Sequence, residues 1–164
     1  MHFSVSRRGG RGYPPTMRND KPLSMPEGGC TCFQIRRAAR KVTAIYDRHL
    51  ADVGLTVTQW GLLANLAGKP PTPIGAYAEV MAMDRTTLTR NIKPLLATGL
   101  MTLSPGPDRR TRALTLTAEG KAMVRRAYPT WRAAEMEVRE ALGTKATTAL
   151  HDTLRTSMAL LDAV

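Results

Sequence analysis

Residues 72–117 read TPIGAYAEVMAMDRTTLTRNIKPLLATGLMTLSPGPDRRTRALTLT, and this stretch decides the fold. It begins with two short segments whose apolar residues recur at helical spacing. Thr72 is expected to cap the first helix, with Pro73 at the first helical position, where its missing N–H costs nothing. Asp84 is expected to cap the second helix, and Gly99 to end it. The sequence therefore predicts two consecutive short helices.

A basic hairpin follows these helices. Apolar residues in 100–103 and 113–116 predict two short strands, and the tip between them contains the Pro, Gly and Asp residues that are typical of turns. Several arginines in such a tip repel one another unless an anion meets them. Two helices followed by a basic hairpin indicate a winged helix-turn-helix, in which one helix enters the major groove of DNA and the wing reaches the backbone or the minor groove.

These residues resemble the MarR family of bacterial transcription regulators, over about residues 30–162. The most specific part is the wing with the Leu-Thr-x-x-Gly that follows it. The motifs that carry the resemblance are Asp84-Arg85-Thr86-Thr87-Leu88-Thr89-Arg90, Gly99-Leu100, Asp108-Arg109-Arg110-Thr111-Arg112 and Leu114-Thr115-Leu116-Thr117-Ala118-Glu119-Gly120. The resemblance implies a mainly α fold with a small β wing, in which a winged helix-turn-helix at about residues 56–116 joins a helical dimerisation region.

The candidate DNA contacts lie on the second helix and in the wing. On the helix they are Arg85, Thr86, Thr87, Thr89, Arg90 and Lys93, and in the wing they are Arg109, Arg110 and Arg112. Arg90 has the geometry to bind guanine through two hydrogen bonds, threonine methyl groups fit thymine, and Lys93 is assigned to phosphate. Asp108 is expected to order a wing arginine, as the family pattern implies, because phosphate repels a carboxylate.

The overall charge fits a polyanionic partner, which we predict to be double-stranded DNA. The chain of 164 residues has 24 Lys and Arg against 13 Asp and Glu, a net charge of +11 and a pI near 10.5. An arginine-rich proteome is the plain alternative, but the positive charges gather in the winged module. No apolar run is long enough for a membrane span, and the N-terminus lacks the apolar centre of a secretory signal. We therefore expect a cytoplasmic protein with no membrane partner.

Three amphipathic segments flank the module. They are predicted as helices over about residues 31–52, 117–142 and 144–162, the last two capped by Thr117 and Thr144. Their apolar stripes need covering, and pairing with a second copy of the chain would do this. The resemblance implies the same two-fold homodimer. Residues 29–164 form one domain in this interpretation, and residues 1–28, rich in Arg, Gly and Pro without periodicity, are predicted to be a flexible basic tail.

The signal to which the protein responds is less defined. The family's ligand pocket lies between dimer helices and winged module, which makes Tyr46, His49 and Trp60 candidate lining residues for a small-molecule effector. Trp60 alternatively belongs to the core, since it shares a helix face with Leu63. His49 is most simply a solvated histidine.

Two cysteines offer a second kind of signal. Cys32-Phe33 lies at the start of the helix predicted over about residues 31–52, and Tyr46 follows fourteen positions later. This pattern resembles the hydroperoxide-sensing branch of the family. The positive end of a helix dipole favours a thiolate there, and thiolates are oxidised faster. Val57 stands where a second tyrosine is expected in that branch. Cys30 and Cys32, two apart on a helix, are poor partners for a disulfide or a metal, and their favoured interpretation is as two small apolar residues at a dimer contact.

The sequence carries no motif of an enzyme, no set of metal ligands and no cofactor site. We predict a dimeric DNA-binding repressor that binds a pseudo-palindromic operator and is released by a small ligand. One alternative is an oxidant sensor of the same fold that uses Cys32. The other, from a different class, is a basic protein that coats nucleic acid or membrane surfaces without sequence preference.

Overall fold

The computed structural model describes residues 27–106 and 111–163, so most of the expected basic tail lies outside the described residues. The elements are α1 (Thr31–Leu50), the 3-10 helix η1 (Ala51–Val53), α2 (Val57–Leu66), β1 (Thr72–Pro73), α3 (Ile74–Val80), α4 (Arg85–Ala97), β2 (Met101–Pro105), β3 (Arg112–Leu116), α5 (Ala118–Leu142) and α6 (Thr144–Leu161). The prediction of a mainly α fold with a small β wing is confirmed.

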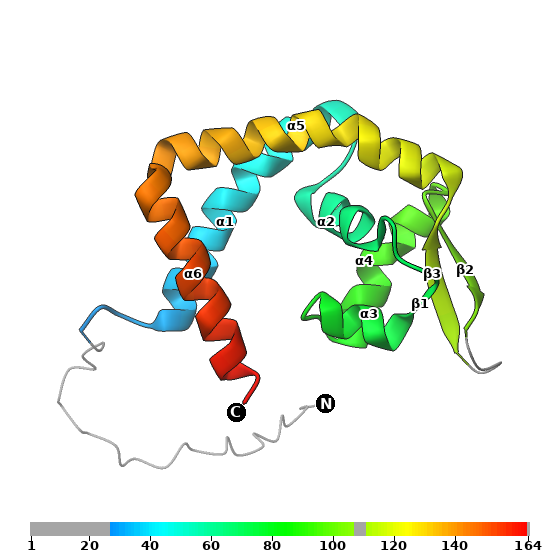
Figure 1. Ribbon diagram of the computed structural model, residues 1–164, viewed down its shortest axis with the longest axis horizontal. Helices are drawn as coiled ribbons and strands as arrows, with labels where there is room; N and C mark the ends of the chain where they lie inside the picture. The colour runs from blue at the N-terminus through cyan, green and yellow to red at the C-terminus, as the bar shows by residue number, and fades with distance from the viewer. Residues whose placement is uncertain (1–26, 107–110, 164) are drawn as a thin grey trace, which may run out of the picture.

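The molecule has the shape of an arch (Figure 1). The long helix α5 forms its top, α1 and α6 descend on one side, and α2, α3, α4 and the strands lie on the other. The first group forms the helical arms and the second the winged module. Among the described residues, no helix combines the length and apolar character needed to cross a membrane.

The wing is a three-stranded antiparallel sheet in the order β1-β3-β2. The hairpin of β2 and β3 runs from the pair Met101–Leu116 to the pair Pro105–Arg112, so both predicted strands form and extend towards the tip. The third strand, β1, was not predicted. It pairs Thr72 with Leu114 and Pro73 with Ala113, and such a two-residue strand has no periodicity of its own to reveal it.

Strand β1 occupies residues that were expected to start the helix after Thr72, which is α3. Helix α3 begins at Ile74, so Pro73 is its N-cap residue and not its first helical residue. Thr72 does not cap the helix. Its hydroxyl donates to the carbonyl oxygen of Pro70 at 2.8 Å, because pairing with β3 holds its backbone extended. The expected cap at Thr144 is wrong for a similar reason: Thr144 is already helical, and the N-cap residue of α6 is Gly143.

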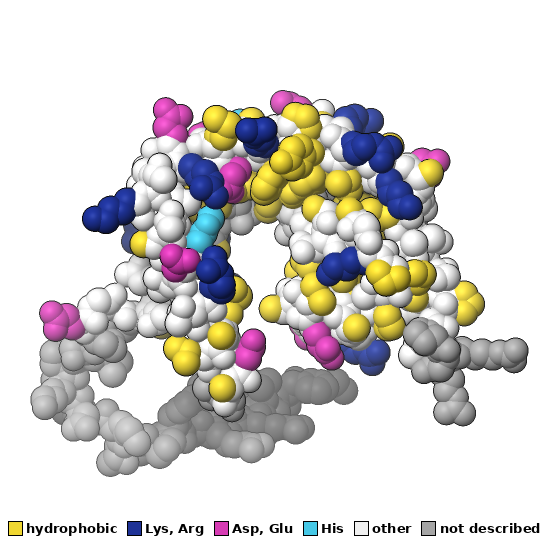
Figure 2. All heavy atoms as spheres, in the orientation of Figure 1, with side chains coloured by type: hydrophobic (Ala, Val, Ile, Leu, Met, Phe, Trp, Pro, Cys, Tyr) yellow, Lys and Arg dark blue, Asp and Glu magenta, His cyan; other side chains and the backbone are white. Residues whose placement is uncertain are grey.

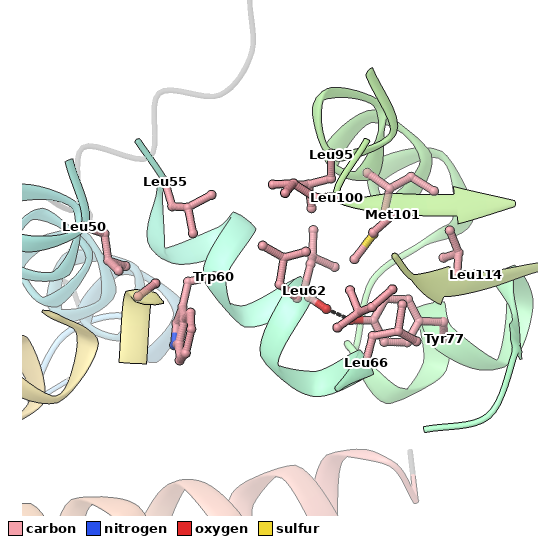
Figure 3. Packing of buried hydrophobic residues seen from close by; sticks show 14 of the residues in the cluster. Leu50, Leu55, Trp60, Leu62, Leu66, Tyr77, Leu95, Leu100, Met101 and Leu114 are labelled. Carbon is pink, nitrogen blue, oxygen red and sulfur yellow. Dashed lines mark hydrogen bonds between the residues drawn. The ribbon is translucent and has the colours of Figure 1, made fainter. Parts of the chain in front are cut away.

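The core fills the space between α2, α3, α4 and the wing (Figure 3). Leu62 and Leu66 of α2 point towards Tyr77 of α3, and Leu95 and Met101 close the other side. The Tyr77 hydroxyl donates to the carbonyl oxygen of Leu62, which satisfies the polar end of a fully buried ring. Burial raises the pKa of Tyr77 to about 12.

The wing joins α5 at a tight junction that explains the Leu-Thr-x-x-Gly motif. The Thr117 side chain accepts from the backbone N–H of Gly120 at 3.0 Å and donates to the carbonyl oxygen of Gly99 at 2.7 Å, so the predicted cap is confirmed. Gly120 faces Leu100 so closely that a Cβ there would overlap the Leu100 carbonyl oxygen and lie 3.0 Å from its carbon. Only glycine fits this position without movement of the backbone.

Replacement of Gly120 with alanine tests this junction. Alanine in a helix is ordinarily more stable than glycine by about 1 kcal/mol, but here the overlap with Leu100 is expected to reverse the sign and cost about 1–3 kcal/mol or more. Gly61→Ala is the matched control, because a Cβ at Gly61 in α2 meets no atom within 4 Å. Urea unfolding should show a lower midpoint for Gly120→Ala and an equal or higher one for Gly61→Ala. A midpoint for Gly120→Ala at or above that of the wild type would contradict the junction.

Candidate nucleic-acid interface

One face of α4 is buried and the other is exposed and basic. Leu88, Ile92 and Leu95 lie in the core, as the apolar periodicity predicts. The exposed residues include every candidate contact of this helix: Arg85, Thr86, Thr87, Thr89, Arg90 and Lys93. The structure thus brings these six side chains together on one helix, with the hydrophobic face fixing which way they point.

The helix starts at Asp84, as predicted. Its carboxylate accepts from the backbone N–H of Thr87 at 2.9 Å and from the Thr87 hydroxyl at 2.6 Å. These hydrogen bonds lower the pKa of Asp84 below its ordinary value, so the cap stays anionic near neutral pH. Both carboxylate oxygens are therefore engaged within the first turn.

The threonine hydroxyls of this face are also engaged. The Thr87 hydroxyl donates to Asp84, and the Thr89 hydroxyl donates to the carbonyl oxygen of Arg85 at 2.7 Å. Neither hydroxyl has its proton left for an outside acceptor, whereas the methyl groups of these exposed residues carry no such commitment. This favours the predicted apolar contact with thymine over hydrogen bonding by these two side chains.

The wing presents Arg112 beside α4. Arg112 is exposed at the first position of β3, paired with Pro105 of β2. The remaining predicted wing residues, Asp108, Arg109 and Arg110, lie outside the described residues. No ion pair links Arg85, Arg90, Lys93 or Arg112 to another residue within the described ranges 27–106 and 111–163, so these cations are available to an anionic partner.

The predicted effector residues are only partly brought together. Tyr46 lines a groove of about 440 Å³ between α1, α5 and α6, whose apolar walls include Val42 and Val138. Trp60 lies elsewhere: it is buried, with its ring centroid 5.9 Å from that of Trp131. This agrees with the alternative that places Trp60 in the core.

His49 likewise does not line the groove. Its Nε2 lies 2.7 Å from a carboxylate oxygen of Glu137, which also accepts from Arg48. These two hydrogen bonds lower the pKa of Glu137. The simple interpretation of His49 as a solvated side chain is thus incomplete, because the ring joins the end of α1 to α5. Glu137 is 88 positions further along the chain, and no local pattern reveals it.

A second polar contact joins the same helices. The Tyr46 hydroxyl donates to Glu135, which also accepts from Arg139 one turn further along α5. Burial raises the pKa of Tyr46, and the hydrogen bond to Glu135 raises it further. For Glu135, burial acts to raise the pKa, but the hydrogen bonds from Tyr46 and Arg139 outweigh it and lower the pKa. The contact therefore fixes Tyr46 as a neutral donor at one wall of the groove.

The two cysteines occupy different settings at the start of α1. Cys30 is the N-cap residue, with extended backbone at φ −76° and ψ 120°, and Cys32 is exposed in the first turn. The expected geometry of two cysteines on one helix is therefore wrong for Cys30. Tyr46 lies fourteen residues further along α1, which at 1.5 Å per residue is about 21 Å, so it does not meet Cys32 of the same chain.

Comparisons with known proteins agree with this geometry. No family model matches the chain. The transcriptional repressor NicR of Pseudomonas putida is 32% identical over 91 residues, which is 55% of this chain and only 58% of that repressor. The transcriptional regulator MosR of M. tuberculosis, solved in complex with DNA, is 33% identical, with a TM-score of 0.69 over 80% of this chain and 98% of the other. BpsR of Bordetella bronchiseptica is 26% identical, with a TM-score of 0.71 over 79% and 93%.

The fold, the exposed basic helix and these likenesses define a winged helix-turn-helix transcriptional regulator. Because the chain covers nearly the whole of a regulator to which it is 33% identical, the earlier resemblance is confirmed. The chain belongs to the MarR family of transcriptional regulators.

Proposed function

We propose that this protein is a homodimeric repressor that binds a pseudo-palindromic operator in double-stranded DNA through α4 and the wing. A small ligand releases it, and the protein acts in the cytoplasm without catalysing a reaction. The observation that carries the proposal is the exposed face of α4, whose cations have no acidic partner among the described residues. The DNA complex of MosR supports the choice of partner.

Within α4, the neighbours of each side chain suggest its role. Arg90 has no intramolecular partner among the described residues and is long enough to reach the O6 and N7 atoms of guanine. Thr87 and Thr89 offer their methyl groups to thymine, because their hydroxyl protons are already donated. Lys93, one turn after Arg90, supplies a point charge for a phosphate.

A second copy of the chain would bury the apolar surface of the arms. Hydrophobic side chains gather over the lower part of α6 (Figure 2). Leu150, Leu154, Met158 and Leu161 recur along one face of α6 and are 38–67% exposed, and Phe33 and Ile35 of α1 are exposed as well. Pairing two such arms sets two winged modules side by side, so that each α4 reads one half of the operator.

For the signal, we favour a small ligand. The groove beside Tyr46 combines apolar walls with a polar end at Tyr46 and Glu135. Ile35, Leu150 and Leu154 of its lining also belong to the surface assigned above to the second copy, so the ligand is proposed to bind at the end beside Tyr46 and Glu135. The Bordetella protein BpsR is regulated in its DNA binding by 6-hydroxynicotinic acid, which supports an aromatic acid as the class to test. Oxidation of Cys32 is the second candidate, because this cysteine is exposed in the first turn of α1.

The first test separates base reading from phosphate binding on α4. Arg90→Ala is expected to reduce the ratio of operator to scrambled-duplex affinity by about 1–3 kcal/mol at the contacted base pair. Lys93→Ala should weaken both duplexes alike and lower the salt slope by about 1. Fluorescence anisotropy over a salt series, with DNA from upstream of the gene, measures both.

Lys145→Ala is the matched control, since it removes the same charge from the exposed start of α6 in the arms. It should leave both quantities unchanged. Equal wild-type affinity for operator and scrambled DNA would instead support the nonspecific binder and defeat the proposal for this DNA.

The second test concerns the dimer. Met158→Glu places a charge on the apolar face of α6, where burial against a partner would leave it unpaired, so the dimer dissociation constant should rise by at least about tenfold. Sedimentation at several concentrations measures this change, and circular dichroism checks the fold. Thr156→Glu adds the same charge on the opposite, exposed face and should have little effect. A Met158→Glu protein that remains as dimeric as the wild type would remove α6 from the interface.

The third test addresses the signal on the preformed operator complex. We expect 6-hydroxynicotinic acid or a related aromatic acid to displace the DNA, and hydroperoxide-treated and reduced protein to bind equally. Release by hydroperoxide that a thiol reverses, and that Cys32→Ser abolishes, would instead assign the signal to Cys32. Because both arms start from the same complex, failure of one leaves the DNA-binding proposal intact.

A further inference from the structure

A small hollow of about 300 Å³ lies between α3, α4 and the tip end of strand β3 of the wing. Its lining residues are Pro73, Ile74, Gly75, Arg85, Thr89, Thr111 and Arg112. We propose that this hollow binds one backbone phosphate of the DNA in each protomer, held jointly by Arg85 and Arg112, and that Gly75 positions Arg85 for this contact. The inference rests on the proposed function and specifies how the protein grips the DNA backbone.

The placement of Arg85 depends on the missing side chain of Gly75. A Cβ at Gly75 would lie 3.2 Å from Nη2, 3.6 Å from Nε and 3.7 Å from Cζ of Arg85. The guanidinium group of Arg85 therefore lies against the first turn of α3, where a Cβ at position 75 would crowd it by a few tenths of an ångström. Such packing restricts the rotamers of a long side chain before DNA arrives, which lowers the entropy lost on binding.

Arg85 forms no ion pair among the described residues, although the anionic Asp84 precedes it in the chain. Arg85 is the first residue of α4, where the helix dipole favours negative charge. The neighbouring carboxylate of Asp84 is committed to Thr87. Arg112 adds a second positive charge to the wall of the same hollow. Two like charges that face one space, with no ion pair to either among the described residues, are stabilised by an anion between them.

The hollow is continuous with the proposed interface. Thr89 belongs to the exposed face of α4 and also lines the hollow, and Arg112 begins the strand that follows the wing tip. A phosphate placed here would lie beside bases that Arg90 reads, one and a half turns along α4 from Arg85. Phosphate contacts carry no sequence information. Arg85, predicted above as a DNA contact without a specified role, is thus assigned to the backbone.

A methylphosphonate scan of the operator tests the shared contact, because each substitution removes the charge of a single phosphate. We expect one position per half-site at which neutralisation weakens the wild type by about tenfold or more. The same substitution should cost the Arg85→Ala/Arg112→Ala double variant little. The salt slope of the double variant should fall by about 0.9 for each phosphate lost.

Arg90→Ala is the control, since it should remain sensitive to that neutralised phosphate. Arg85→Ala and Arg112→Ala should be non-additive, because the remaining arginine keeps part of the contact. Additive losses that map to two different phosphates would overturn the shared site while leaving operator binding intact. Absence of operator-specific binding by the wild type would instead be a failure of the proposed function.

Gly75→Ala tests the positioning role separately. Alanine favours the helix, so the unfolding temperature should stay equal or rise, while the crowded guanidinium is displaced and operator affinity falls a few-fold. Unchanged affinity would overturn the role of Gly75. A thermal-shift titration with inorganic phosphate at constant ionic strength distinguishes the two sources of the ligand. A saturable response that Arg85→Ala abolishes would support a phosphate site in the hollow. The same response, with no methylphosphonate position that depends on Arg85 and Arg112, would identify free phosphate as the occupant and overturn the assignment to DNA.

Discussion

The close contact between Gly120 and the carbonyl group of Leu100 is the constraint on which the rest of the arrangement depends. It seats the first turn of α5 directly on the start of the wing hairpin, and Thr117 adds hydrogen bonds to Gly99 and Gly120 at the same point. The wing is therefore joined rigidly to a 25-residue helix whose other end lies in the arms. A displacement of the first turn of α5 is therefore expected to move the wing with it, because Gly120 meets the Leu100 backbone directly.

The other end of α5 is held to α1 both by buried apolar packing, which includes Ala134, Val138 and Leu50, and by polar contacts. Tyr46 contacts Glu135, and Arg48 and His49 share Glu137. Hydrogen bonds of this kind can be exchanged for contacts with a ligand or with water at small net cost, whereas overlap of backbone atoms cannot. The groove lies beside the first of these contacts. The proposed ligand site thus adjoins the exchangeable polar contacts between α1 and α5, whereas the Gly120 end of α5 carries the wing of the proposed DNA site.

How much of the fold could be predicted from the sequence depends on how far apart along the chain the interacting residues lie. Asp84, Gly99 and Thr117 act on backbone groups within a few positions, so their types and spacing predicted helix boundaries that the structure confirms. Thr72 and Thr144 have the same side chain as Thr117, but the capping roles predicted for them are wrong. Thr72 instead pairs with Leu114 of β3, which is distant in sequence. Thr144 is preceded by Gly143, whose φ is +78°.

The candidate site likewise contains residues that could be predicted from the sequence and residues that could not. The exposed face of α4 could be predicted because burial of Leu88, Ile92 and Leu95 leaves only one side for polar residues. The partners of Tyr46 and His49 could not, because Glu135 and Glu137 lie on a helix that meets α1 only in the folded chain. The same holds for Gly75, whose importance appears only when Arg85 is seen to pack against it.

The cations of α4 also differ in their surroundings along the helix. At its start, exposed Arg85 lies against Gly75 of α3 and shares a hollow with Arg112 of the wing. Further along, Arg90 and Lys93 are exposed and without ion-pair partners among the described residues, so they can adjust to what they meet. A cation in a hollow shared with the wing suits the DNA backbone, and an exposed one further along the helix suits the variable base edges. We infer that the start of α4 sets the register of the protein on DNA, and that this fixed register is what allows Arg90 to discriminate between bases.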